Sequence, residues 1–409
     1  MNETYSVEPS DKVSISKSEI LTGKEKIKTP LGGDIPLSKI LDKLVKEAEL
    51  YEKLDNKKVH CYACQHNCKI PENSRGICQV RYNKKGALYS PFNYIAALQL
   101  DPIEKKPLFH VYPGINALTF GMMGCDFHCA YCQNWNISQT LRNADAGVRP
   151  RQFSAENIIQ IAKQQNAQAI VSSYNEPLIT SEWSQEIFKL AKKENLITAY
   201  ISNGNASIEA LEYIRPNTDC YKVDLKSFNE KNYRKLGGQL KNIINSIENI
   251  YKKGFWLELV TLLIPGFNDS KDEIKNMARF IKNISPDIPW HISAFHKDYK
   301  MKDPNNTEAK DLIKAVEIAY SEGLNFVYAG NRPGQVKNYQ NTYCPKCKQL
   351  LVERIAYVVT KYNINSESCC NICNHKIPGL WSFNNREINL GKEEDIKTRR
   401  PKIIKTVQH

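Results

Sequence analysis

The stretch 124–135, GCDFHCAYCQNW, places three cysteines, Cys125, Cys129 and Cys132, on one short segment. At C-x3-C-x2-C spacing, three thiolates can each bind one corner iron of a [4Fe–4S] cube, which leaves the fourth iron without a protein ligand. A coordination position that the protein leaves open is where a substrate or cofactor binds. Zinc or three buried thiols are the alternatives, but zinc sites favour C-x2-C pairs and four ligands. The spacing therefore predicts a reactive iron–sulfur centre.

The chain around this stretch predicts an α/β fold. Between residues 117 and 330, short β-rich runs alternate with helical patterns, and Ser154 and Ser181 are expected helix N-caps. Such alternation predicts parallel strands joined by crossover helices. No G-x-G-x-x-G follows the first strand, and the three cysteines come directly after it, where barrels keep their chemistry. A full or partial TIM-like barrel over 115–335 therefore fits better than a Rossmann sheet. The expected strands are ALTFGMM (117–123), AIVSSY (169–174), ITAYIS (197–202), CYKVDL (220–225), WLELVTLLI (256–264), WHISAF (290–295) and NFVYAG (325–330).

Composition and charge limit the class of protein. The chain has 409 residues, of which 41% are hydrophobic, which is enough for a large catalytic domain with one or two small modules. Its formal charge of +13 is spread along the chain and favours acidic partners in general. A lysine-rich solvated surface explains this charge equally well. Nucleic acid therefore stays open as a partner, without being indicated by charge alone.

Cysteine usage indicates the compartment. Twelve of the thirteen cysteines fall in three groups with metal-ligand spacing, and only Cys220 stands apart, as expected of a buried core thiol. Grouped cysteines in a long chain indicate metal sites, whereas disulfide frameworks are typical of short secreted chains. The N-terminal residues lack the apolar core of a signal peptide, and no run reaches the ~18 apolar residues of a membrane span. We expect a soluble cytoplasmic protein, kept away from oxygen and without a membrane partner.

The part of the chain before the barrel predicts a metal-binding module over 34–114. Residues 1–33 are polar and predict a disordered extension. An apolar stripe at helical spacing then predicts an amphipathic helix from about Ile35 to Leu54. Four cysteines follow at C-x2-C-x3-C-x9-C spacing, which suits zinc or a second [4Fe–4S] cluster, and the C-x2-C-x3-C run favours the cluster. These four residues are Cys61, Cys64, Cys68 and Cys78.

Two C-x2-C pairs near the C-terminus predict a second small module over 340–382. Cys344 and Cys347 form the first pair, and Cys370 and Cys373 form the second. This arrangement is typical of a zinc ribbon, with rubredoxin-like iron as the alternative. Cys369 adjoins Cys370 and could replace it, although Cys370 keeps the two-residue spacing. The segment 387–409 predicts a charged tail.

Several further segments, in a consistent order, extend the pattern well beyond the three cysteines. They are CYACQHNC, DPIEKKPLFHVYPG, SSYNEP, KVDLKSF, PWHISAFHKDY, VYAGN and CPKC. With them, the chain from about Val59 to Trp381 resembles the radical S-adenosylmethionine (SAM) superfamily. Within it, the chain is most similar to the radical SAM enzymes of the AmmeMemoRadiSam system, near relatives of the pyruvate formate-lyase-activating enzymes.

The resemblance implies a partial (βα)6 barrel with a [4Fe–4S] cluster at its mouth and SAM bound to the open iron. One electron, from a reductant such as flavodoxin or ferredoxin, would cleave SAM to methionine and a 5′-deoxyadenosyl radical. This radical would abstract hydrogen from a substrate that no motif names. Because activating enzymes take hydrogen from a glycine of a partner protein, a protein substrate is expected. Methyl transfer to RNA and a lipid or cofactor step stay open.

The resemblance also implies which residues contact SAM. The Asn175–Glu176 segment lies where relatives carry Gly-Gly-Glu-Pro and hold the methionine amino group, although Ser-Tyr-Asn replaces the glycines here. Ser-Asn-Gly at 202–204 is similar to the segment near the ribose and methionine carboxylate. Asp224 and Lys226 alternate past Leu225 and so share one face of a strand, from which Lys226 would neutralise a carboxylate. The implied set is Tyr131, Asn175, Glu176, Asn203, Gly204, Asp224, Lys226, His296 and Tyr328.

A non-catalytic protein is the alternative from another functional class. Iron–sulfur electron carriers and nucleic-acid adaptors also use ribbon modules with grouped cysteines. This alternative does not explain why one cluster has only three protein ligands and lies at the mouth of a barrel. The sequence therefore favours the enzyme.

Overall fold

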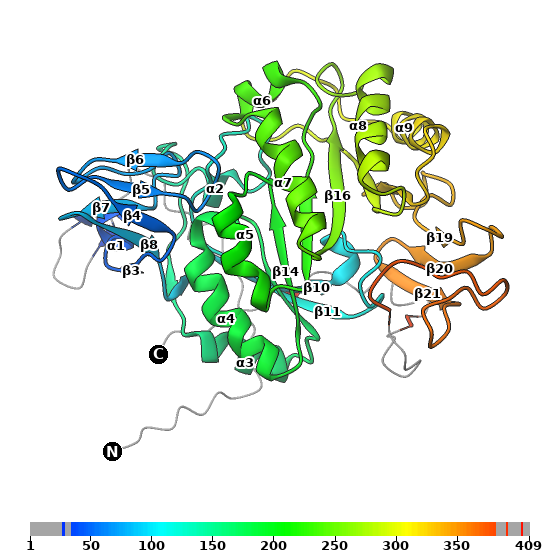
Figure 1. Cartoon of the computed structure of the whole chain (residues 1–409), viewed down its shortest axis with the longest axis horizontal. Coiled ribbons are helices and arrows are strands. Elements are labelled where there is room, and N and C mark those ends of the chain that lie inside the picture. The colour runs from blue at the N-terminus through cyan, green and yellow to red at the C-terminus, as the bar shows by residue number, and fades with distance from the viewer. Residues whose placement is uncertain (1–26, 29–33, 382–389, 392–401, 404–409) are drawn as a thin grey trace.

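The computed structural model describes residues 34–381 together with the short pieces 27–28, 390–391 and 402–403. The predicted extension 1–33 and tail 387–409 lie almost wholly outside these residues. The centre of the molecule is a nine-stranded sheet in the order β18-β17-β16-β15-β14-β13-β11-β10-β22 (Figure 1). Its parallel strands are β11 (Asn116–Gly121), β13 (Ala169–Ser172), β14 (Ile197–Ser202), β15 (Cys220–Asp224), β16 (Trp256–Leu263), β17 (Trp290–Ala294) and β18 (Val327–Gly330).

Helices connect the successive parallel strands and cover one face of the sheet (Figure 1). At the other end of the strand order, β10 (Ala97–Pro102) runs antiparallel to β11, and β22 (Lys402–Ile403) pairs with β10. Six strand–helix units and a closing strand make up the open, partial α/β barrel that the sequence predicts. Its helices are α2 (Trp135–Ser138), α3 (Ala155–Gln164), α4 (Ser181–Lys193), α5 (Ile208–Ile214), α6 (Glu230–Leu236), α7 (Leu240–Lys252), α8 (Lys271–Ile284) and α9 (Ala309–Ser321), with 3-10 turns at η2 (Ile103–Lys105), η3 (Pro177–Thr180) and η4 (Arg215–Asn217).

The predicted helix starts are right in one case and wrong in the other. Ser154 caps α3, because its hydroxyl accepts a hydrogen bond from the Asn157 amide. Ser181 instead lies inside α4, where its hydroxyl donates to the Leu178 carbonyl at 2.9 Å. The reason is the preceding turn η3, which leads directly into α4 and moves the start of the helix back by one residue. Across 34–381 and the three short pieces, no helix has both the length and the apolar character that crossing a bilayer requires.

The predicted helix from Ile35 to Leu54 is wrong. Only α1 (Leu37–Leu41) is helical, and two short strands follow, β3 (Val45–Glu47) and β4 (Tyr51–Lys53). β3 pairs with β8, which is distant in sequence, and β4 forms a hairpin with the next strand, β5. This strand pairing overrides the local helical spacing. Beyond β3, buried Ala48 and Leu50 alternate with exposed residues, a period of two that overlaps the helical pattern.

Short antiparallel sheets replace that helix in the N-terminal module, which lies beside the barrel at the left of Figure 1. The first sheet has the order β3-β8-β7, and the second has the order β4-β5-β6. The added strands are β5 (Val59–Cys61), β6 (Cys68–Ile70), β7 (Tyr82–Lys84) and β8 (Ala87–Pro91); the two-residue strands β9 (Tyr94–Ile95) and β12 (Arg151–Gln152) pair nearby, as do β1 (Ile27–Lys28) and β2 (Asp34–Ile35).

A buried ion pair joins this module to the barrel. The guanidinium of Arg81 contacts both carboxylate oxygens of Glu182 on α4, at 2.7 and 2.8 Å. Glu182 also accepts a hydrogen bond from the Ser90 hydroxyl at 2.9 Å and one from the Glu49 amide at 3.1 Å. Burial raises the pKa of Glu182, but Arg81 outweighs it and lowers the pKa to about 2. Both charges therefore persist in the interior, because each satisfies the other.

The C-terminal module is a three-stranded antiparallel sheet at the opposite side of the barrel (Figure 1). Its strands are β19 (Thr342–Tyr343), β20 (Leu350–Ile355) and β21 (Val358–Tyr362). The module packs on the barrel through a separate hydrophobic cluster that includes Phe109, Tyr328 and Trp381. It forms the outer end of the molecule next to β10 and α9.

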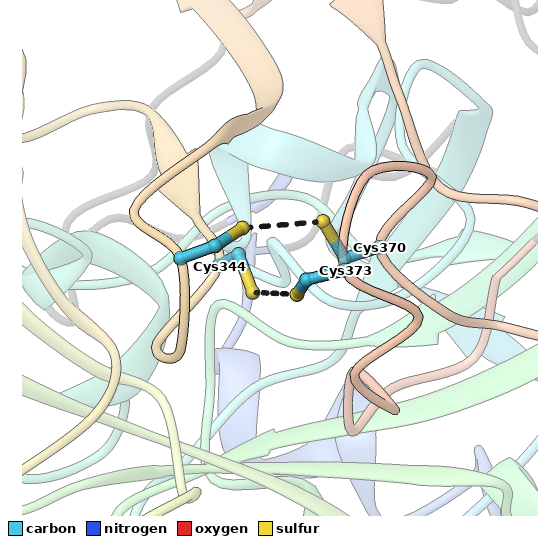
Figure 2. Close-up of side chains that lie close together, drawn as sticks. Cys344, Cys370 and Cys373 are labelled. Atoms are coloured by element: carbon cyan, nitrogen blue, oxygen red, sulfur yellow. Dashed lines mark hydrogen bonds between the residues drawn. The ribbon is translucent and has the colours of Figure 1, made fainter.

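Four cysteines of this module form a compact group. The sulfur atoms of Cys344 and Cys373 are 3.6 Å apart, and those of Cys347 and Cys370 are 3.7 Å apart. All four lie within 4.8 Å of one another, and Figure 2 shows three of them pointing inward. Thiolates at 2.3 Å from one tetrahedral ion are about 3.8 Å apart, so the group fits a single metal ion. Cys369 points elsewhere, toward the Glu367 carbonyl, so Cys370 and not Cys369 belongs to the group that could hold a metal ion.

Removing the Glu182 carboxylate should destabilise the fold. Glu182→Ala leaves the Arg81 charge buried and unpaired, and we expect the free energy of unfolding to fall by about 3–5 kcal/mol in denaturant titrations. The stabilisation is complete above the unfolded pKa of about 4.3 and disappears as the pH falls through the folded value of about 2. Glu194→Ala, which breaks the exposed Lys163–Glu194 pair, is the control and should change stability by less than about 1 kcal/mol. Equal effects of the two variants would contradict a role for the buried pair.

Serine substitutions should separate the two adjacent cysteines of the ribbon. Cys370→Ser removes one ligand of the compact group, so the purified chain should lose about one metal ion and its C-terminal module should unfold at lower temperature. Cys369→Ser is the matched control and should keep the metal. Elemental analysis and thermal unfolding measure both effects. Loss of metal from the Cys369 variant alone would reverse the assignment.

Candidate functional site

A cavity of about 460 Å³ opens at the carboxyl ends of the parallel strands. Its volume lies in the range of small-molecule sites, and its position is the one where barrels carry chemistry. Nine of the twelve residues that the sequence predicts for the cluster and for SAM line this one cavity. They are Cys125, Cys129, Tyr131, Cys132, Asn175, Glu176, Asn203, Asp224 and Lys226.

The loop that follows β11 is fixed from several directions. The Met122 amide donates to the Asn175 side chain at 3.0 Å, and the His128 amide donates to the Leu236 carbonyl at 2.9 Å. Arg142 donates to the carbonyls of Phe127 and Cys125, at 2.7 and 3.0 Å. These bonds hold the loop between three elements of the barrel, so the three cysteines have defined positions before any cofactor binds.

The three cysteines suit a cube better than a single ion. Among the described residues, only the C-terminal group brings three or more metal-binding atoms within 4.8 Å of one another. Thiolates that each bind a different iron must be farther apart than thiolates around one ion. Burial raises the pKa of the Cys129 thiol to about 12, with Lys226 acting against the rise. A thiol in such a place ionises when a metal compensates it, so the donor set fits a [4Fe–4S] cluster.

The SSYNEP segment keeps a glycine-type backbone although it has no glycine. Tyr174 has a φ of 73°, in the left-handed region that glycine adopts most easily. A side chain on Gly121 would lie 2.9 Å from Tyr174 and 2.7 Å from the Ser173 carbonyl, so Gly121 makes room for this segment. A left-handed turn at Tyr174 therefore follows β13, and Tyr174 contributes to the cavity wall.

Glu176 joins the ends of two neighbouring strands. Its carboxylate accepts hydrogen bonds from the Ser202 hydroxyl at 2.8 Å and from the Asn203 amide at 2.7 Å. Asn203 in turn donates to Asp126 at 2.6 Å, next to Cys125. Burial, followed by repulsion from Asp126, raises the pKa of Glu176 to about 8. The site thus contains two close carboxyl groups that a bound ammonium group would compensate.

Lysines on one strand face neutralise a third carboxylate. Asp224 contacts Lys222 and, at 3.2 Å, Lys226. Burial raises the pKa of Asp224, but the two lysines lower it to about 2. Lys222, Asp224 and Lys226 lie two residues apart and all line the cavity. One acid cannot neutralise two lysines, so this wall keeps positive charge available for an anionic group.

Three implied contact residues lie elsewhere. Tyr328 is buried behind the cavity, where its hydroxyl bonds to His110 at 2.6 Å and to Thr342 at 2.9 Å, so it joins barrel to ribbon. His296 is exposed and does not line the cavity, and Gly204 does not line it either. The structure therefore does not bring these three residues to the cavity wall, and their contact with SAM stays a prediction.

Several cavity residues were missed by the sequence reasoning. Lys105 and Lys106, from DPIEKKPL, line it beside Asp101, and Lys106 pairs with Asp101 at 2.9 Å. The motif was recognised, but its side chains had no assigned role. His291 also lines the cavity and bonds to Glu258 at 2.6 Å. The ribbon contributes Gln340, Ala356 and Tyr357, which no local pattern could reveal because the contact depends on how the modules pack.

The four N-terminal cysteines lie next to this site. Cys61 and Cys68 are register partners on β5 and β6, and Cys64 lies in the turn between them. The turn approaches the cluster loop, where the His66 ring nitrogen is 3.8 Å from Asp126. The structure thus places a second cysteine group beside the first.

Comparison with known proteins agrees with this geometry. A family model described as the radical SAM superfamily matches residues 121–281. An uncharacterized protein of Methanocaldococcus jannaschii is 35% identical over 337 residues, which cover 81% of this chain and 99% of that protein. A pyruvate formate-lyase-activating enzyme of Clostridium pasteurianum is 27% identical over 230 residues, covering 50% of this chain and 89% of that enzyme.

Among solved structures, a domain of a pyruvate formate-lyase-activating enzyme from Bacteroides vulgatus is 17% identical, with a TM-score of 0.35. The match covers 40% of this chain and 100% of that domain. The family assignment comes from the sequence matches, which include the loop with Cys125, Cys129 and Cys132. This chain belongs to the radical SAM superfamily and is related to the pyruvate formate-lyase-activating enzymes.

Proposed function

We propose that this protein is a radical SAM enzyme of the AmmeMemoRadiSam type that cleaves SAM reductively and takes hydrogen from a protein substrate. The observation that carries the proposal is that the three cluster cysteines and six of the nine implied SAM residues line one cavity at the strand ends. An electron carrier or nucleic-acid adaptor has no need of such a cavity. When bound, the cluster and SAM supply methionine and the 5′-deoxyadenosyl radical.

The residues of the chain have three tasks in this proposal. Cys125, Cys129 and Cys132 would each hold one iron of the cluster, which would leave the fourth iron without a protein ligand. Glu176 lines the cavity next to the buried carboxylate of Asp126 and suits an ammonium group. The Lys222–Asp224–Lys226 wall lies on the side suited to a carboxylate. These charges would orient a bound amino acid, because only one orientation brings its ammonium group to the acidic side chain and its carboxylate to the lysines.

Exclusion of water is the remaining task, since a radical must meet only its intended partner. Tyr131 is buried against Phe267 at a ring distance of 5.9 Å, close to two cluster ligands. Leu262 and Val260 add apolar surface at the end of β16. The cavity lining therefore combines apolar side chains, which exclude water, with the charged side chains described above.

A protein substrate is favoured by the relationship to activating enzymes, whose name states that they activate another enzyme. The sheet order ends at β18 and β22 without closing, so the barrel has an open side that suits a peptide loop. The ribbon residues Ala356 and Tyr357 border the cavity and narrow its outer part. In this proposal the ribbon metal is zinc, with iron as the alternative, and it shapes that border without joining the chemistry.

Loss of one cluster ligand should abolish SAM cleavage. Two remaining thiolates cannot hold a stable cube with a free corner, so Cys129→Ala should form no 5′-deoxyadenosine above background after anoxic reconstitution and reduction. Cys220→Ala removes a buried thiol on β15 and is the control for general effects of thiol loss. Near-normal 5′-deoxyadenosine from the Cys129 variant would overturn the assignment, and a wild-type cluster inert to SAM would overturn the proposed function.

Isotope transfer tests the substrate class. Reduced enzyme is incubated without oxygen with size-separated fractions of a deuterium-labelled lysate, and deuterium in 5′-deoxyadenosine is measured by mass spectrometry. We expect label to come from the protein fraction, because hydrogen abstraction moves one deuterium from substrate to 5′-deoxyadenosine. Label delivered only by molecules below protein size would contradict a protein substrate.

A further inference from the structure

We propose that Cys61, Cys64, Cys68 and Cys78 bind a second [4Fe–4S] cluster, which relays single electrons from an acidic carrier protein to the catalytic cluster. The metal site stands on the cysteine group itself. The relay role rests on the proposed function. The two parts are therefore tested separately.

The fold gathers the four thiols on one side of the N-terminal module. Antiparallel pairing of β5 with β6 places Cys61 opposite Cys68. Cys64 lies in the connecting turn, which a bond from the Asn67 amide to the Cys64 carbonyl closes at 3.2 Å. A second turn brings Cys78 to this hairpin, since Gly76 lies 3.7 Å from the Cys68 sulfur, measured from the position of an added Cβ. Three of the four thiols are buried.

The residue after Cys78 has the same left-handed backbone conformation as the residues that follow two of the ribbon cysteines. Gln79 follows Cys78 with a φ of 67°, just as Lys348 follows Cys347 at 61° and Asn374 follows Cys373 at 55°. A left-handed residue after the cysteine turns the next backbone amides back toward the sulfur, an arrangement that favours bound anions and iron–sulfur centres. The N-terminal group thus carries a turn that two ribbon ligands also use.

Spacing distinguishes the kind of metal. Across 34–381, the atoms of the ribbon group come within 4.8 Å of one another, whereas no three of the N-terminal thiols do. The three catalytic cysteines are likewise more widely spaced than a single ion allows. Because cube ligands bind separate irons, the N-terminal group resembles the catalytic set and differs from the single-ion set. A cluster, rather than zinc, is the metal that the geometry favours.

Direct contacts connect this group to the catalytic loop. Gly124, with a φ of 94°, packs so closely that an added Cβ would lie 2.8 Å from Val80 and 3.2 Å from the Cys78 carbonyl. One guanidinium nitrogen of Arg142 donates to both the Ile77 carbonyl, at 2.7 Å, and the Cys125 carbonyl, at 3.0 Å. Cys78 and Cys125 therefore lie on adjoining loops joined by backbone and one shared donor. This is a short covalent and hydrogen-bonded route for an electron.

The outer surface of the module suits an acidic electron carrier. Residues 51–86 contain six lysines, all exposed, and three acidic residues. Ile77, beside Cys78, is 45% exposed and offers an apolar contact next to the second cysteine group. Opposite charge steers two proteins together and speeds their encounter more than it tightens the complex. The six lysines are Lys53, Lys57, Lys58, Lys69, Lys84 and Lys85.

The relay balances as a one-electron transfer. The reduced carrier loses one electron and the second cluster gains it. The same electron then passes to the catalytic cluster, so the second cluster returns to its oxidised state. No proton or atom moves, and the carrier is the only net reductant.

Metal analysis tests the site without reference to activity. Anoxically reconstituted wild-type chain should contain about eight irons, and Cys68→Ser and Cys129→Ala should each contain about four. The combined variant should contain almost none, and Cys220→Ala should match the wild type. Electron paramagnetic resonance of the reduced Cys129 variant should still show a cluster. About four irons and an extra zinc in the wild type would overturn the cluster assignment.

Comparison of two reductants tests the relay. With reduced flavodoxin as donor, Cys68→Ser should form 5′-deoxyadenosine at least about tenfold more slowly than the wild type, whereas dithionite should restore the rate to within about threefold, since a small reductant reaches the catalytic cluster directly. If Cys68→Ser instead turns over normally with flavodoxin, or loses both reactions equally, the relay role is wrong. A wild type inactive with either donor would refute the proposed function and leave the metal analysis unaffected.

Discussion

Buried side-chain hydrogen bonds tie together the carboxyl ends of β11, β13 and β14, and the whole site depends on them. Asn175 accepts the Met122 amide, Glu176 accepts the Asn203 amide, and Asn203 donates to Asp126. The first two bonds each join one strand end to its neighbour, and the third joins the ends of β14 and β11 across β13. Together they hold the loop that carries the cluster cysteines. Since the groups are buried, breaking any one bond leaves an unsatisfied polar atom, which makes the arrangement cooperative.

Much of this fold could be predicted from sequence because its signals are local. The parallel strands are buried on both faces and form apolar runs that need no partner to be recognised. The cysteine spacings and Asp224–Lys226 were equally readable, since short spacing fixes relative position. The predicted helix over 35–54 is wrong because pairing with other strands decides the conformation of that segment. One partner, β8, lies far along the chain, and the other, β5, forms a hairpin with β4.

Local sequence patterns could not predict the residues whose role depends on packing between modules. Tyr328 has the sequence context of a strand end, yet its hydroxyl bonds to His110 and to Thr342 of the ribbon. Tyr357 lies in a hairpin turn of the ribbon, and only the docking of that module brings it to the cavity. Lys222 had a usable signal, because it precedes Asp224 by two residues on the same strand face. Extending the same alternation by one step before Asp224 would have identified Lys222.

The ribbon hairpin beside the cavity would make the shape of the cavity entrance depend on the metal bound in the ribbon. In the proposed function iron forms the reactive centre, while a metal ion in the compact thiol group would stabilise the ribbon whose hairpin carries Ala356 and Tyr357. A chain with iron but an empty ribbon would keep its reactive centre behind an entrance of altered shape. With zinc in the ribbon, selectivity would depend on zinc and reactivity on iron. A shortage of zinc would then change which molecules enter the cavity before it lowered the rate of the reaction.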